Sequence, residues 1–230
     1  MALTESAKAE QISPSQFVES EGLEDWRLVG SDGACAYFRA PSFAEGARLV
    51  HAISALPRVD EPQVAVDVRR DGVTVSLITI TKDYFGMSTR DVELARQISA
   101  AARKLQFAAD PSKVQSLLVI PGATDTAQVM PFWQAVLGYE RRPDTPNEDL
   151  MDPRGRGAGF WFEPMKEPRK DGLGAIHICV WVPREEAEAR IKAALAAGGR
   201  MVRDQFAPSW WTLADPAGNE ADIATISGRS

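Results

Sequence analysis

The spacing of apolar and polar positions divides the chain into short strands and amphipathic helices. In residues 13–106, alternating apolar positions predict two hairpins, which turn at Gly30-Ser31-Asp32-Gly33 and Arg70-Asp71-Gly72. Apolar positions at helical spacing predict three helices, and Ser13 and Ser88 are the expected caps of the first and the last. This half is therefore expected to form a four-stranded antiparallel sheet with helices on one face.

The second half carries its pattern twice. Leu150-Met151-Asp152-Pro153-Arg154-Gly155 returns as Leu213-Ala214-Asp215-Pro216-Ala217-Gly218, each time after an amphipathic helix that ends in glycine and before a short apolar strand. Such a pattern predicts two βαβββ units. Neither unit can bury its apolar faces alone, so the two are expected to pair and to leave a cleft between them. The fold class that follows is α+β.

The same patterns place the boundaries between domains. Residues 1–12 are expected to be a disordered tail and residues 13–106 a first domain. The linker is expected at residues 107–113, around the turn Asp110-Pro111-Ser112, and residues 114–230 form the second domain.

Composition narrows the classes of partner. The chain has 26 basic and 32 acidic side chains and a net charge of −6, without a basic patch that would favour nucleic acid. No apolar run reaches the length of a membrane span, and the amino terminus has no basic-then-apolar leader. A cytoplasmic protein is expected, in which Cys35 and Cys179 are reduced and buried.

The stretch Gly86-Met87-Ser88-Thr89-Arg90-Asp91-Val92-Glu93-Leu94-Ala95, with the order of elements over about residues 13–105, resembles the pterin-4a-carbinolamine dehydratases. That family dehydrates 4a-hydroxytetrahydropterins with a His-His-Pro motif and a later histidine. The matching positions here read Asp60-Glu61-Pro62 and Ile80. Asp60 and Glu61 would serve as acid and base only if burial raised their pKa values. A solvated acidic loop is the favoured interpretation, which makes this domain a degenerate pterin-binding or oligomerisation module.

The second half resembles the vicinal-oxygen-chelate superfamily, nearest to the glyoxalase-like group that includes bleomycin-resistance proteins. The resemblance rests on five segments in the expected order, which are Phe132-Trp133-Gln134-Ala135-Val136-Leu137-Gly138-Tyr139, Asp152-Pro153, Phe160-Trp161-Phe162-Glu163, Ile176-His177-Ile178 and Asp215-Pro216-Ala217-Gly218-Asn219-Glu220. It implies a small-molecule site in the cleft between the two units.

Members of this superfamily usually place one metal ligand on each of four strands, and the chemistry suits zinc, nickel, manganese or iron. Carried over by position, the resemblance implies Glu163, His177 and Asp222 as the second, third and fourth ligands. The first position falls on Gln115 or on Leu118, depending on the reference point used for counting. Gln115 would complete a divalent-metal site. Leu118 would leave three protein ligands and no tightly held metal, and this second outcome is favoured.

The histidines and tryptophans supply the remaining candidates. His51 and His177 are the two histidines of the chain, and His51 is expected to be a packed core residue. His177, with Glu163 and Asp222, is the candidate catalytic group. Flat or apolar ligands favour aromatic walls, so the candidate ligand-binding residues of this half are Trp161, Trp181, Trp211 and Glu220. Trp210 and Trp211 are adjacent on one strand and must face opposite sides.

Three functions remain open. The leading hypothesis is binding or turnover of a small molecule, aromatic or pterin-like, in the cleft of the second domain, with or without a metal. As an enzyme the protein would then be a lyase or a dioxygenase. The first alternative is an active 4a-hydroxytetrahydrobiopterin dehydratase that uses Asp60 and Glu61, and the second is a drug-sequestering binding protein. Homo-oligomers are expected, because both resembled families commonly form them.

Overall fold

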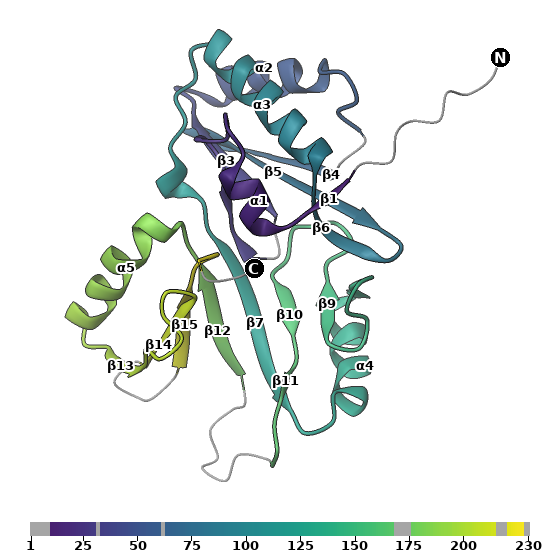
Figure 1. Ribbon diagram of the computed structural model, residues 1–230, viewed down its shortest axis with the longest axis vertical. Coiled ribbons are helices and arrows are strands. Elements are labelled where there is room, and N and C mark those ends of the chain that lie inside the picture. The colour runs from purple at the N-terminus through teal and green to yellow at the C-terminus, as the bar shows by residue number, and fades with distance from the viewer. Residues whose placement is uncertain (1–9, 31–32, 61–62, 168–175, 215–219, 228–230) are drawn as a thin grey trace, which may run out of the picture.

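The computed structural model describes residues 10–30, 33–60, 63–167, 176–214 and 220–227, and it consists of two sheets with their helices (Figure 1). The first sheet runs in the order β1-β6-β5-β3-β2, and β4 pairs with β5 on its free side. Its elements are β1 (Gln11–Ile12), α1 (Pro14–Glu19), β2 (Arg27–Leu28), β3 (Ala34–Arg39), α2 (Phe43–Ser54), β4 (Gln63–Val68), β5 (Gly72–Thr81), β6 (Tyr84–Ser88) and α3 (Thr89–Lys104).

Local signals account for the ends of these helices. Ser13 and Gln16 form a capping box at α1, where Pro14 is the first helical residue. At α3, the backbone N–H and the hydroxyl of Ser88 both donate to Asp91 Oδ2, at 2.7 Å each. Both predicted caps are confirmed. The predicted tail is wrong at its last two residues, because Gln11–Ile12 pair with β6.

One face of the first sheet packs against its helices, and the other face carries none. Along β4, Val64, Val66 and Val68 pack against the core of this half, whereas Gln63, Ala65 and Asp67 point away and are exposed. This alternation is the period of two that a half-buried strand requires. The core that results is continuous and includes Phe17, Phe38, Leu49, Leu77 and Ile98.

The second sheet confirms the duplication. Its order is β13-β14-β15-β12-β7-β10-β9-β8, with β11 also paired to β7. The two predicted units therefore have the same internal strand order, read outward in opposite directions from the β7–β12 pair. The first unit holds β7 (Ser116–Ala123), α4 (Thr126–Leu137), β8 (Glu140–Arg141), β9 (Asp149–Met151), β10 (Gly159–Trp161) and β11 (Glu163–Pro164). The second unit holds β12 (Ile176–Trp181), α5 (Arg184–Ala196), β13 (Arg200–Arg203), β14 (Trp210–Ala214) and β15 (Glu220–Ala224).

Both helices of the second half lie on the same side of its sheet. α4 packs through Met130 over Leu150 and Phe162, and α5 packs through Ala187 over Leu213 and Ile223. The opposite side, which we call the helix-free face, holds Trp161, His177, Cys179, Trp210 and Asp222. These assignments follow from strand parity and from the registers that pair Cys179 with both Leu118 and Asp222.

The halves meet through side chains of both sheets. Val29 and Cys35 from the first half share a buried cluster with Cys179 and Trp181 from the second. Gly30 approaches Trp181 so closely that a Cβ there would lie 2.7 Å from the indole Cδ1. The segment that connects the two sheets forms an ion pair with the first sheet, between Arg39 and Asp110 at 2.6 Å. It also contains the short 3-10 helix Pro111–Lys113.

Cys35 and Cys179 are both buried and are not joined in a disulfide. Among the described residues, no helix is long and apolar enough to span a membrane.

Candidate functional site

The helix-free face gathers a hydrogen-bonded network on its central strands. His177 Nε2 on β12 lies 3.2 Å from Asp222 Oδ2 on β15. The other carboxylate oxygen, Asp222 Oδ1, accepts a hydrogen bond from Thr212 Oγ1 on β14 at 2.6 Å. The side chains of His177 and Asp222 are 18% and 12% exposed, so the pair is largely withdrawn from water and remains reachable. Three adjacent strands therefore hold one imidazole in a fixed orientation.

The local charges favour the protonated imidazole. The hydrogen bond to Asp222 raises the pKa of His177, and burial acts in the opposite direction. The negative charges of Asp222, Glu163 and Glu220 raise the pKa further. The net effect is a raised pKa, so His177 binds a proton more readily than an isolated histidine does near neutral pH.

The two predicted glutamates lie near this network in different settings. Glu163, on β11, is exposed and is paired in register with Gly122. Glu220, on β15, is half-buried and forms an ion pair with Arg203 at 3.1 Å. Both act on His177 through their charge. The structure therefore brings His177 and Asp222 into contact, with Glu163 and Glu220 as neighbouring charges.

Gln115 is not brought to this group. The β7–β12 register pairs Ser116 with Trp181 and Ile120 with His177, so Gln115 lies beyond the opposite end of β7. Its Oε1 accepts a hydrogen bond from Arg190 Nη1 at 3.4 Å. Next to His177, β7 offers Ile120 and Leu118 to the helix-free face, and neither side chain can bind a metal.

These residues do not fit the four-ligand metal site that the family resemblance implies. Two oxygens of Asp222 are already engaged by Thr212 and His177. Within the described part of the chain, no group of three His, Cys, Asp or Glu side chains is arranged to hold a metal ion.

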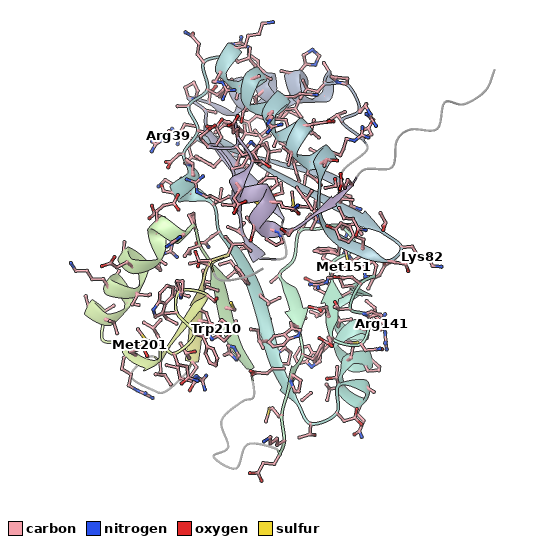
Figure 2. The ribbon with its side chains drawn as sticks, viewed as in Figure 1. Arg39, Lys82, Arg141, Met151, Met201 and Trp210 are labelled. Carbon is pink, nitrogen blue, oxygen red and sulfur yellow. The ribbon has the colours of Figure 1, made fainter. Side chains whose placement is uncertain are left out.

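The predicted tryptophans separate onto different surfaces. Trp161 and Trp210 pack on the helix-free face, where Trp210 stacks on Phe206 with ring centroids 4.3 Å apart. Figure 2 shows Trp210 beside β12 and β15. Trp181 shares the helix-free face with His177 by strand parity, but there it is buried against the first half. Trp211, predicted as a ligand contact, instead packs into the cluster under α5. The sequence predicts that Trp210 and Trp211 face opposite sides of the sheet, because they are adjacent on one strand. It does not indicate which of the two faces the site.

The remaining candidates lie in the first half. Asp60 is exposed in a turn, and Glu61 lies outside the described residues. His51 is exposed on α2, which corrects the expectation of a packed core histidine. Ile80 lines a cavity of about 310 Å³ between the two halves, together with Leu118 and Phe160. His177 and Asp222 are not among the residues that line it.

Residues 117–224 match the family model of the glyoxalase-like domain. The second half is a glyoxalase-like domain. This agrees with its paired βαβββ units and with the superfamily expected from the motifs. No curated protein matches the chain.

Solved structures match about half of this chain at low identity. A protein described as the NAD-dependent benzaldehyde dehydrogenase from Legionella pneumophila is 14% identical over 47% of this chain and 97% of its own, with a TM-score of 0.36. A glyoxalase/bleomycin resistance protein/dioxygenase superfamily member from Vibrio splendidus 12B01 is 15% identical over 49% and 99%, with a TM-score of 0.30. Lactoylglutathione lyase from Agrobacterium tumefaciens is 16% identical over 52% and 99%, with a TM-score of 0.21. Likeness at this level does not identify a reaction.

Proposed function

We propose that the helix-free face of the glyoxalase-like domain binds a small flat molecule and exchanges a proton with it through His177. The observation that supports this most is the Thr212–Asp222–His177 network, which fixes an imidazole of raised pKa at a partly open surface. The aromatic rings of Trp161 and Trp210 on the same face would supply the surface for stacking.

Asp222 defines which nitrogen of His177 can react. In the neutral ring, Nε2–H donates to Asp222 Oδ2, so Nδ1 carries the lone pair and serves as the base. After Nδ1 takes a proton, the negative charge of Asp222 stabilises the imidazolium. This is the arrangement by which a carboxylate orients a histidine for general acid–base catalysis. A lyase or an isomerase that removes a proton next to a carbonyl group could use it without a metal.

Within this proposal the first half contributes binding or assembly rather than dehydration. The position that the dehydratase resemblance gives to a histidine is occupied here by Asp60, which is exposed to solvent. This position therefore offers no imidazole to move a proton near neutral pH. Sequestration of a drug-like molecule without chemistry is the remaining alternative, and the experiment below separates it from turnover.

Acetophenone tests both parts of the proposal, because it is flat, binds no metal tightly and has exchangeable methyl hydrogens. Its binding should shift the ring resonances of ¹⁵N-labelled His177, which are assigned by comparison with the other histidine, His51. In D₂O the protein should accelerate exchange of the methyl hydrogens for deuterium. His177→Gln should abolish the acceleration, whereas His51→Gln, at an exposed site on α2, should leave it unchanged.

The outcomes discriminate among the functions. A shift at His177 without hydrogen exchange would support binding alone and overturn the proton-transfer step. If millimolar acetophenone causes no shift at His177 and no hydrogen exchange, the proposed site is overturned. Exchange that survives His177→Gln would assign the base to another residue.

A further inference from the structure

The cavity between the halves is built from surfaces that neither half could close alone. Its upper wall is the face of the first sheet without helices, which contributes Ala65, Ile78 and Phe85. Its lower wall is the end of β9 and the turn that follows, including Met151 and Asp152. Figure 2 shows Met151 at this end of β9, below the hairpin of β5 and β6. The volume of about 310 Å³ is in the range of pockets that hold small ligands.

The walls are of mixed polarity, and their apolar part includes aromatic rings from both halves. Phe85 comes from β6 and Phe160 from β10, and Ile78, Ile80 and Leu118 fill the space around them. The guanidinium of Arg142 lies over the Phe85 ring at 5.0 Å from its centroid, so this cation–π contact crosses between the halves. Flat apolar walls of this kind favour a planar ligand that stacks or slides between them.

The charged groups of the lining are all engaged in ion pairs. Arg142 Nη1 lies 3.4 Å from Asp149 Oδ1, and Arg154 Nε lies 3.5 Å from Asp152 Oδ1. Arg142 also pairs with Asp144, which is outside the lining, at 2.7 Å. Asp152 also accepts hydrogen bonds from the backbone N–H groups of Arg154 and Gly157, each at 2.9 Å. A ligand with a net charge would have to break a pair or remain uncompensated in a partly dry site, which costs free energy.

Polar groups that carry no charge add hydrogen-bonding capacity. Gln63 presents an amide and Ser76 a hydroxyl on the same first-half wall. The amide both donates and accepts, and so does the hydroxyl. A suitable ligand would therefore carry donors and acceptors on one edge and an apolar ring face.

We propose that this cavity is a second small-molecule site, for an uncharged planar molecule of one or two fused rings with both donor and acceptor groups. It is independent of the function proposed for His177, which does not line the cavity. A ligand there would contact both halves at once, so its binding would also stabilise their association by mass action.

Quinazolin-4-one is a suitable probe, because it is planar and uncharged and has a donor–acceptor edge. Calorimetry with the full chain should detect its binding, and benzoate and benzylamine, as an anion and a cation, should bind more weakly. The probe should also raise the melting temperature. Tighter binding of either charged compound would overturn the argument from paired charges, and no binding of any of the three would overturn the site.

Variants place the probe in the cavity. Ala65→Trp should fill the cavity from an exposed strand and weaken binding by about tenfold or more. Asp67→Trp is the matched control, because Asp67 is exposed on the same face of β4 and does not line the cavity. Arg154→Gln should favour benzylamine over benzoate, because it removes one positive charge. Equal binding by Ala65→Trp and the wild type would place the probe elsewhere. An acetophenone response at His177 that changes with Ala65→Trp would overturn the independence of the two sites.

Discussion

Each half of the molecule surrounds one aspartate with hydrogen bonds, and the two aspartates differ in what surrounds them. Asp91 in the first half is fully buried, and Asp91 Oδ2 accepts from the backbone N–H and hydroxyl of Ser88 and from the hydroxyl of Thr79. Asp222 in the glyoxalase-like domain is slightly exposed and contacts Thr212 and His177. Hydroxyl and amide groups do not titrate near neutral pH, whereas an imidazole does. The first network stabilises a helix end, and the second is suited to proton transfer.

The largest expected effect of this difference is on stability. Asp91→Ala removes the acceptor for three donors in a closed core and should lower the free energy of unfolding by about 3 kcal/mol. Asp222→Ala should cost about 1 kcal/mol, because water can reach the partners that it leaves. Urea unfolding monitored by tryptophan fluorescence measures both.

Thr79→Val is the control if Asp91→Ala does not fold. It removes one of the three hydrogen bonds to Asp91 and keeps the shape of the side chain, so a loss of about 1 kcal/mol is expected. A greater loss for Asp222→Ala than for Asp91→Ala would reverse the contrast between the two networks.

The next effect concerns the acidity of His177. Because the bond to Asp222 is the main cause of its raised pKa, Asp222→Asn should lower that pKa. Thr212→Val should change it less, because Thr212 acts on His177 only through Asp222. NMR titration of the two histidine rings measures the shift, with the exposed His51 as an internal reference. An unchanged pKa in Asp222→Asn would show that the pair does not form in solution.

Stability should follow the same titration. The folded-state pKa of His177 lies above its unfolded value, so the pair contributes fully below the unfolded pKa and is lost as the pH rises through the folded pKa. The stability advantage of the wild type over His177→Gln should therefore be larger at pH 6 than at pH 9. Parallel urea titrations at the two pH values measure it. An advantage that grows toward pH 9 would contradict the direction of the pKa shift.

Features set by neighbouring residues could be predicted from the sequence. The Ser13–Gln16 and Ser88–Asp91 caps depend on residues three positions apart, and the turn at residues 70–72 joins strands that pair as expected. The duplication also predicted that the second half contains two βαβββ units that pair, and the second sheet contains both units side by side.

Features set by long-range pairing could not be predicted. Choosing between Gln115 and Leu118 required the register of β7 against β12, and no local pattern contains that register. Strand parity places Trp210 and Trp211 on opposite faces of the sheet. Which of the two is covered depends on where α5 packs, and α5 covers Trp211. The cavity between the halves depends on how the two sheets pack against each other. Neither the sequence repeat nor the motifs specify that packing.

The amount of bound metal is expected to be small. With Leu118 and Ile120 at the β7 positions beside His177, the site has one imidazole and carboxylates that are already engaged or exposed. Protein purified without a chelator should retain well below one transition-metal ion per chain, and His177→Ala should not change its content. Elemental analysis checks this. About one metal ion per chain, lost in His177→Ala, would reassign the helix-free face to a metal-dependent reaction.

The smallest expected effect is on pterin dehydration. The positions of the three histidines in the dehydratase resemblance are Asp60, Glu61 and Ile80, and Asp60 is exposed. An imidazole moves protons efficiently near neutral pH, and none of these three positions carries one. The protein should therefore leave the dehydration of a 4a-hydroxytetrahydropterin close to its uncatalysed rate, and Asp60→Asn and Glu61→Gln should make no difference. Absorbance of the quinonoid product measures the rate. Turnover on the order of 1 per second that Glu61→Gln abolishes would make the first half an active dehydratase. The reaction of this protein would then be assigned to the first half and not to His177.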